Sequence, residues 1–205
     1  MTDEKEKELQ ELIKTGKFTD PTVFAQLTQE DKENLMNLAT LNFILSESAK
    51  FRGKVIDAAI FFEAVITETL GNYFVGGNES KKNTLIKSLV FNRQNISSKI
   101  SLLRKILQIE HKELYEKYKS DFADADKILI FRNNIAHSVL DTSDKFRKEM
   151  VKNPLFDGVK INYYQNAEFK TELITQKIVD NFYSDCYKLI GKFVNLQNEL
   201  LKNNG

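Results

Sequence analysis

Apolar residues recur every three or four positions along most of this 205-residue chain, which is the spacing of an amphipathic helix. The C-terminal stretch is the clearest example, with apolar positions at Ile178, Phe182, Cys186, Leu189, Phe193, Leu196 and Leu200. A second stripe consists of Ile100, Leu103, Ile106, Leu107 and Ile109. The spacing predicts a helix over about residues 175–203 and another that begins at Ser97 or Ser98.

The N-terminal half predicts four further helices. Residues 3–15 alternate charged and apolar positions, which is typical of a short, exposed helix. Thr28, with Asp31 three residues later, is a signal for the start of a helix that runs through Leu45. The stretch 55–74 is apolar nearly all round and ends in a glycine cluster, so we expect a buried helix there. A shorter helix is expected over about 83–91.

The remaining segment combines a helix, a loop and a small sheet. Helical spacing predicts a helix over 124–140, and the loop 141–158 contains Pro154 and Gly158. Polar and apolar residues alternate over 159–174, which favours one small β-hairpin. Tyr163-Tyr164 lies outside any helical stripe and is a candidate for an exposed contact surface.

These patterns predict an all-α fold, a bundle of five to seven helices with one small hairpin. No repeat or low-complexity linker marks a domain boundary, so a single helical domain over 1–205 is expected. Its core would comprise about 28–140 and the helix 175–203, with the helix 1–15 at the periphery. Two prolines and eight glycines are few for this length, which favours long, uninterrupted helices.

Composition narrows the setting. No stretch approaches 18 uncharged apolar residues, and the N-terminus does not resemble a secretory signal, so we expect neither a membrane span nor export. Cys186 is alone, which excludes an intrachain disulfide, favours a cytoplasmic location and predicts a buried structural thiol. Two histidines and one cysteine form no recognisable metal cluster, so neither a metal nor a cofactor is expected.

Charge is segregated, although the net charge is only +1. The segment 81–109 contains no acid, and its bases are Lys81, Lys82, Lys87, Arg93, Lys99, Arg104 and Lys105. Such a segment can form a positive face for a phosphate backbone, and it can equally consist of solvated helix faces balanced elsewhere. On the first interpretation Lys99, Arg104 and Lys105 are candidate nucleic-acid-binding residues.

The segment 130–138 has the most distinctive chemistry, because it brings together Arg132, Asn133, Asn134 and His137. Arginine is a permanent cation whose fork fits phosphate oxygens, and histidine can take or give a proton near neutral pH. These are the groups needed to cleave an RNA phosphodiester without a metal. The alternative is structural, because an arginine and a histidine near a helix end commonly cap carbonyls or pair with acids.

Helix geometry limits how these groups can meet. At about 100° per residue, Asn133 and His137 lie about 40° apart on one face, whereas Arg132 and His137 lie about 140° apart. Either the helix bends near Ala136, or an arginine and a histidine from two chains meet across a two-fold axis.

The sequence Phe-Arg-Asn-Asn-Ile-Ala-His-Ser, late in a helical chain, resembles the HEPN superfamily. The hallmark there is an arginine, a polar residue that is usually asparagine, and a histidine four to six residues after the arginine. Arg132, Asn133 and His137 match it. The arrangement is also similar to the mannitol-operon-repressor family, which has a comparable Arg-Asn…Ala-His segment. The resemblance covers roughly residues 50–140.

The resemblance implies a helical homodimer, and in many HEPN proteins a metal-independent ribonuclease that acts as a toxin, in phage defence or in RNA processing. Arg132, Asn133 and His137 would line a cleft at the dimer interface, and RNA and a protein partner such as an antitoxin would be bound. Other members are non-catalytic binding modules or regulators. One toxin branch has a tyrosine two residues after the histidine, where a partner enzyme modifies it, and this chain has Val139 there.

Glu63 is a supporting candidate, because the resemblance places an acidic residue in an apolar helix that precedes the motif. Its neighbours are apolar, and a buried acid needs a partner or a raised pKa. It would orient His137, pair with Arg132, or form a structural hydrogen bond to another helix. Asn134 is a second supporting residue.

Overall fold

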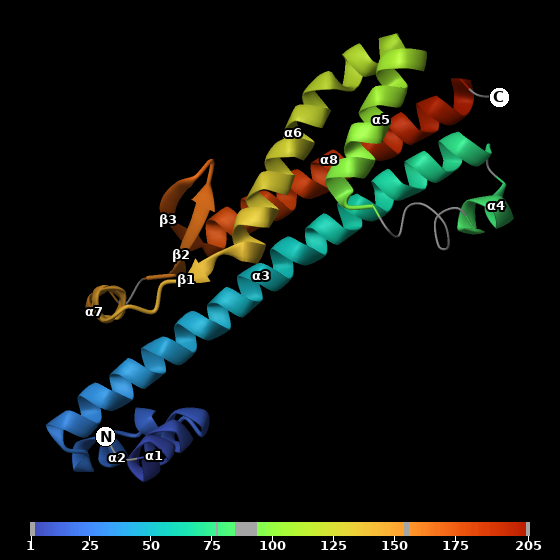
Figure 1. Cartoon of the computed structure of the whole chain (residues 1–205). Helices are drawn as coiled ribbons and strands as arrows, with labels where there is room; N and C mark the ends of the chain where they lie inside the picture. Colours follow the sequence, from blue (N-terminus) through green and yellow to red (C-terminus); the bar gives the residue numbers. More distant parts are fainter. Residues whose placement is uncertain (1–2, 77, 85–93, 154–155, 204–205) are drawn as a thin grey trace. The chain divides into compact units, whose positions relative to one another are not determined.

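The structure is a computed structural model, and it describes residues 3–76, 78–84, 94–153 and 156–203 (Figure 1). These residues form eight α-helices, one short 3-10 helix and one three-stranded antiparallel sheet, which confirms the all-α class with a small hairpin. Contacts divide the chain into two compact units, between which the sequence showed no boundary. Unit 1 comprises Met1–Phe51 and Ser138–Gln176, and unit 2 comprises Arg52–His137 and Lys177–Gly205.

The N-terminal part of unit 1 contains three short elements, α1 (Asp3–Lys14), the 3-10 helix (Lys17–Thr19) and α2 (Pro21–Gln26). The sequence indicated only the first of them. Asp20 caps α2 by accepting a hydrogen bond from the amide of Thr22 at 2.9 Å, and Pro21 occupies the first helical position, where its missing N–H costs nothing.

Helix α3 (Gln29–Val75) is the longest element, with 47 residues. It begins at the predicted capping box, in which the Asp31 amide donates to the Thr28 hydroxyl at 3.1 Å and the Thr28 amide donates to Asp31 at 3.4 Å. The two separate helices expected over 28–45 and 55–74 are therefore one. The residues between them contain no proline, and Phe51 is buried, so nothing ends the helix there.

The sheet of unit 1 has the order β1-β2-β3, with β1 (Val139–Leu140), β2 (Gly158–Gln165) and β3 (Glu168–Thr175). β2 and β3 form the predicted hairpin, and Tyr164 lies opposite Phe169. Asn166 and Ala167 both have positive φ (53° and 64°), as a two-residue type I′ turn requires. β1 and β3 are the two edge strands of this sheet, and β3 is the longer of them.

Helix α7 (Asp144–Lys152) lies within the segment expected to be a loop. Ser143 caps it by accepting from the Phe146 amide at 3.3 Å, and the two buried apolar residues, Phe146 and Met150, are four positions apart on one face. Three apolar residues in nine positions, one of them the exposed Val151, are too few to reveal a helical period in the sequence.

Unit 2 contains the rest of α3, α4 (Glu79–Thr84), α5 (Ile96–Glu110), α6 (Lys112–His137) and nearly all of α8 (Gln176–Asn203). α5 and α6 run antiparallel and are joined at His111 (Figure 1). The helix predicted over 83–91 coincides with the structure only at the end of α4, and residues 85–93 lie outside the described residues.

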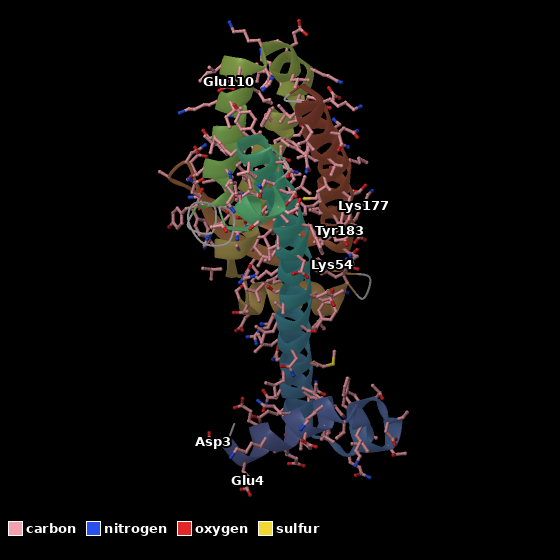
Figure 2. The ribbon with its side chains drawn as sticks, turned by 90° about the vertical axis from the view of Figure 1, so that its right-hand side faces the viewer. Asp3, Glu4, Lys54, Glu110, Lys177 and Tyr183 are labelled. Atoms are coloured by element: carbon pink, nitrogen blue, oxygen red, sulfur yellow. The ribbon has the colours of Figure 1, made fainter. Side chains whose placement is uncertain are left out.

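Aromatic side chains from three helices form the centre of unit 2. The ring of Phe193 on α8 packs edge-on against Phe62 of α3 at 5.3 Å and against Phe122 of α6 at 5.2 Å. Cys186 is buried as predicted, and burial raises the pKa of its thiol to about 12. On the surface, Lys54 of α3 pairs with Asp180 of α8 at 3.5 Å, close to the exposed Tyr183 (Figure 2).

Two helices differ from the prediction in their bounds. α5 begins one residue before Ser97, because Asn95 is the cap and accepts from the Ser98 amide at 2.9 Å. The motif helix, predicted over 124–140, is α6: it begins earlier, at Lys112, and it ends at His137, because Val139 and Leu140 form the strand β1.

Candidate functional site

The last turns of α6 carry the motif, and apolar neighbours fix how this part of the helix is oriented. Ile128, Leu129 and Ile135 are buried in unit 2. Phe131 stacks on Phe182 of α8 with ring centroids 4.9 Å apart. With this face held against the core of unit 2, Asn133 and His137 lie on the opposite side of the helix, whereas Arg132 lies close to the buried face.

The motif residues differ in their exposure and in their contacts. Asn133 and His137 are exposed, as expected for two residues on one helix face, and Arg132 and Asn134 are half-buried. The guanidinium Nη1 of Arg132 donates to Oδ1 of Asn133 at 3.0 Å. Across the described residues, the side chains of His137 and Asn134 form no hydrogen bond or ion pair. The imidazole is thus available to a ligand.

The helix is unbroken through Ala136 and ends at His137. No interruption of α6 therefore brings Arg132 and His137 onto one face, and the turn of the helix keeps them about 140° apart. The first of the two arrangements that the sequence left open, a bend near Ala136, is therefore not supported by a break in α6. One chain alone presents His137 together with Asn133, and Arg132 on another side of the helix.

Glu63 has a different partner from the two motif residues considered for it. Its Oε1 lies 2.6 Å from Nζ of Lys99 on α5, so it forms the structural bond to another helix. No hydrogen bond or ion pair in the described part of the chain links it to Arg132 or His137. The expectation that it is buried is also wrong, because its side chain is 34% exposed.

Lys99 is buried, which corrects its proposed role as a phosphate-binding residue. Its side chain is 6% exposed, and its ammonium is held by Glu63 and by the hydroxyl of Thr67 at 3.1 Å. The sequence contained a signal for this: Lys99, Leu103 and Ile106 are spaced i, i+4 and i+7, so the lysine lies in phase with the apolar stripe of α5.

Arg104 and Lys105 differ from Lys99 and from one another. Arg104 is partly buried and donates to Asp126 at 2.7 Å and to the backbone carbonyl of Phe122 at 3.2 Å, both on α6. Lys105 is exposed and lines a shallow hollow with Asn95, Ser98 and Ser101. The three basic residues thus point in different directions and form no continuous positive face.

One face of α6 connects Arg104 to the motif. Asp126, Ile130, Asn133 and His137 follow the spacing i, i+4, i+7 and i+11, and all four are exposed. We call this set the outer face of α6. Ile130 is 49% exposed and is the large apolar side chain on this face. Arg104 contacts this face at Asp126, about 10 Å from Asn133 along the helix axis.

The described residues contain neither a metal-binding cluster nor a membrane-spanning helix. No group of three histidine, cysteine, aspartate or glutamate side chains is arranged to hold a metal ion. No described helix is long and apolar enough to cross a membrane.

The chain matches no family model, no curated protein and no solved structure.

Proposed function

We propose that this chain is a metal-independent endoribonuclease of the HEPN type that acts on RNA as a homodimer. In this proposal His137 is the acid or base, Arg132 binds the scissile phosphate and Asn133 orients Arg132. The observation that carries the proposal is the availability of these groups. His137 is exposed, and its side chain has no partner across the described residues. The side chain of Arg132 forms one hydrogen bond there, to its neighbour Asn133.

The chemistry requires one proton to be removed and another to be supplied. A base takes the proton of the ribose 2′-hydroxyl, whose oxygen attacks the phosphorus and forms a 2′,3′-cyclic phosphate. The bond from phosphorus to the 5′-oxygen breaks, and an acid protonates that oxygen. A guanidinium next to the phosphoryl oxygens stabilises the charge that develops on them. None of these steps needs a metal ion.

A homodimer supplies what one helix lacks. The angle of about 140° separates Arg132 from His137 within a chain, so the arginine of one copy would meet the histidine of the other across a two-fold axis. Two copies also provide two imidazoles, one for each proton transfer. Arg104, which contacts the outer face of α6, would bind a neighbouring phosphate after exchanging Asp126 for it.

The proposal includes a substrate, a cellular compartment and a protein partner. RNA is the substrate, and the cytoplasm is the compartment in which a lone thiol such as Cys186 stays reduced. As a toxin or a phage-defence ribonuclease, the protein would be controlled by a protein partner such as an antitoxin.

The experiment is cleavage of a mixed single-stranded RNA in excess EDTA by the wild-type chain and by His137→Ala, with circular dichroism to check the fold of the variant. We expect cleavage by the wild type, products that end in 2′,3′-cyclic phosphate, and loss of cleavage in the variant. Lys127→Gln, an exposed change on the same helix, is the matched control and should cleave normally. Cleavage by well-folded His137→Ala at the wild-type rate would disprove the assignment.

A second candidate is a non-catalytic regulatory or binding module, similar to the binding members of the HEPN superfamily or to the mannitol-operon repressor. The observation in its favour is that Arg132 and His137 do not converge within one chain. RNA that binds without being cleaved, with affinity that falls in Arg132→Gln, would support this candidate over the enzyme.

A further inference from the structure

The edge strand β3 carries an unusual set of exposed residues. Phe169 is 60% exposed and Leu173 is 38% exposed, and with Thr171 they lie on one face of the strand. Tyr164, opposite Phe169 on β2, is 74% exposed, and its ring packs edge-on against Phe169 at 5.4 Å. An edge strand with exposed apolar residues is a template for pairing with another strand.

The other face of β3 carries two charges, those of Lys170 and Glu172, for which the described residues contain no charged partner. Nζ of Lys170 donates to the Gln165 side chain at 3.0 Å, and Glu172 accepts a hydrogen bond from the Tyr163 hydroxyl at 2.8 Å. Neither residue forms an ion pair in the part of the chain that the structure describes. An oppositely charged side chain from another molecule would stabilise each of these half-buried charges.

We propose that β3 pairs antiparallel with β3 of a second copy of this chain, across a two-fold axis that passes through Thr171. In that register Lys170 lies opposite Glu172 of the second copy, and Glu172 opposite its Lys170. Phe169 lies opposite Leu173 on the other face, and the two Thr171 residues meet at the axis. Opposite charges, an aromatic beside an aliphatic residue, and Thr–Thr pairs are all stabilising cross-strand pairs.

Charge excludes the neighbouring registers. The side chains of opposed residues must lie on the same face, so the smallest shifts of register move the axis to Lys170 or to Glu172. An axis through Lys170 places the two lysines opposite each other and Glu168 opposite Glu172. An axis through Glu172 places the two glutamates opposite each other. Of these three axes, only the one through Thr171 pairs unlike charges. An axis through Phe169 would pair Glu168 with Lys170, and the Glu168→Lys variant described below distinguishes that register from the one through Thr171.

The pairing would join two three-stranded sheets into one of six strands. The exposed aromatic and aliphatic side chains on one face would then become continuous across the axis, with Phe169 and Leu173 covering each other. The inference uses no motif residue, and it is separate from the dimer in which Arg132 and His137 would meet, because β1, which follows His137, lies at the opposite edge of the sheet from β3. Its test contains no RNA, so it can succeed or fail independently of the ribonuclease proposal.

The first test measures association of the full chain by analytical ultracentrifugation from micromolar to near-millimolar concentration. We expect a concentration-dependent dimer, weakened about tenfold in Glu172→Lys, because two symmetric attractions become repulsions. Lys170→Glu should weaken it similarly. The double variant Lys170→Glu/Glu172→Lys restores unlike charges across the axis and should recover the wild-type affinity. Glu168→Lys, which lies opposite Ile174 of the second copy, is the control on the same strand and should change nothing.

The second test reads the register by cross-linking. Residues opposed in an antiparallel pair have Cα atoms about 4.5–5.5 Å apart, which is within the range of a disulfide. Thr171→Cys should therefore form a disulfide-linked dimer under mild oxidation. Lys170→Cys should not, because its two copies are about 8 Å apart in this register. The native Cys186 is fully buried, so the wild-type chain provides the background.

These outcomes decide the inference in either direction. A wild-type chain that stays monomeric throughout the range, or a dimer that is indifferent to both single charge reversals, would overturn it. So would equal cross-linking of Thr171→Cys and Lys170→Cys. Circular dichroism of each variant separates loss of association from loss of fold.

Discussion

The ammonium of Lys99 on α5 lies 2.6 Å from the carboxylate of Glu63 on α3, yet only one partner of this ion pair is exposed to water. The side chain of Lys99 is 6% exposed and that of Glu63 is 34% exposed. The hydroxyl of Thr67 is the other group that binds the ammonium. This asymmetry means that removing one partner should cost more than removing the other.

We expect Glu63→Ala to lower the free energy of unfolding by about 2–3 kcal/mol, because it leaves a buried ammonium without a counter-charge. Lys99→Met should cost less than about 1 kcal/mol, because an apolar side chain of similar length replaces the stem and the exposed carboxylate can be hydrated. Urea denaturation of both variants and of the double variant measures the two costs and their coupling. A larger cost for Lys99→Met than for Glu63→Ala would contradict this account.

The same pair shows what could be predicted from the sequence and what could not. Apolar periodicity gave the helical class and the C-terminal helix, because a long amphipathic helix repeats its signal several times. The partner of Glu63 could not be predicted, because it is 36 residues away on a helix whose packing angle no local pattern specifies. The sequence does show that Lys99 lies on the apolar face of its helix. The many basic residues around it, however, favoured a charged surface.

Helix α3 supplies a second example, in the neighbouring residues Phe61 and Phe62. An apolar stretch that surrounds the helix predicted burial of both, and the structure buries only one. Phe62 is fully buried against Phe193, whereas Phe61 is 56% exposed. Which side of such a helix faces the core depends on the other helices, so the sequence of α3 alone cannot decide it.

These two phenylalanines make a matched pair for a stability measurement. Phe62→Ala should lower the free energy of unfolding by about 3–5 kcal/mol, through lost burial and the cavity that remains. Phe61→Ala should change it by less than about 0.5 kcal/mol, as for other surface substitutions. Both values come from chemical denaturation followed by circular dichroism. Similar costs for the two variants would show that Phe61 is buried in the protein in solution, for instance in an oligomer.

The raised pKa values of two tyrosines should make the free energy of unfolding depend on pH in the alkaline range. Burial, and then the hydrogen bond to Glu199, raise the pKa of Tyr118 to about 12. Burial and the hydrogen bond to Glu110 raise the pKa of Tyr73 to about 12 as well. The neutral phenol is thus favoured in the folded state, whereas the pKa of tyrosine in the unfolded chain is about 10.

The sign follows from linkage. A folded pKa above the unfolded value gives stability that is fully present below about pH 10 and is lost as the pH rises toward about 12. We expect the free energy of unfolding to fall between these values, and to fall less steeply in Tyr118→Phe. That variant should also lose about 1 kcal/mol at neutral pH, through the missing hydrogen bond. Urea titrations at several alkaline pH values test both effects, and an equal slope in the variant would exclude Tyr118 as a contributor.

The motif could be predicted in part. Its helix and the shared face of Asn133 and His137 follow from sequence spacing, and both residues are exposed in the structure. The exposure of Ile130 and the contact of Arg104 with Asp126 could not be predicted, because both depend on how α5 packs against α6. The outer face of α6 became recognisable only with the neighbouring helix in place.

Two substitutions of Arg132 distinguish the contribution of its positive charge from that of its planar guanidinium group. If Arg132 binds the scissile phosphate, Arg132→Gln should lower the rate of RNA cleavage by about 10²–10³, the usual cost of losing one group that stabilises the transition state. Arg132→Lys keeps the charge but loses the planar fork, so we expect an intermediate loss. Asn133→Ala should cost about tenfold, because the only contact of its side chain that the structure describes is with Arg132 at 3.0 Å. Single-turnover cleavage of a defined RNA in EDTA gives the three rates. If Arg132→Lys cleaves at the wild-type rate, a positive charge without the planar fork is sufficient at this position. If Asn133→Ala loses the most activity of the three variants, the asparagine and not the arginine contacts the phosphate.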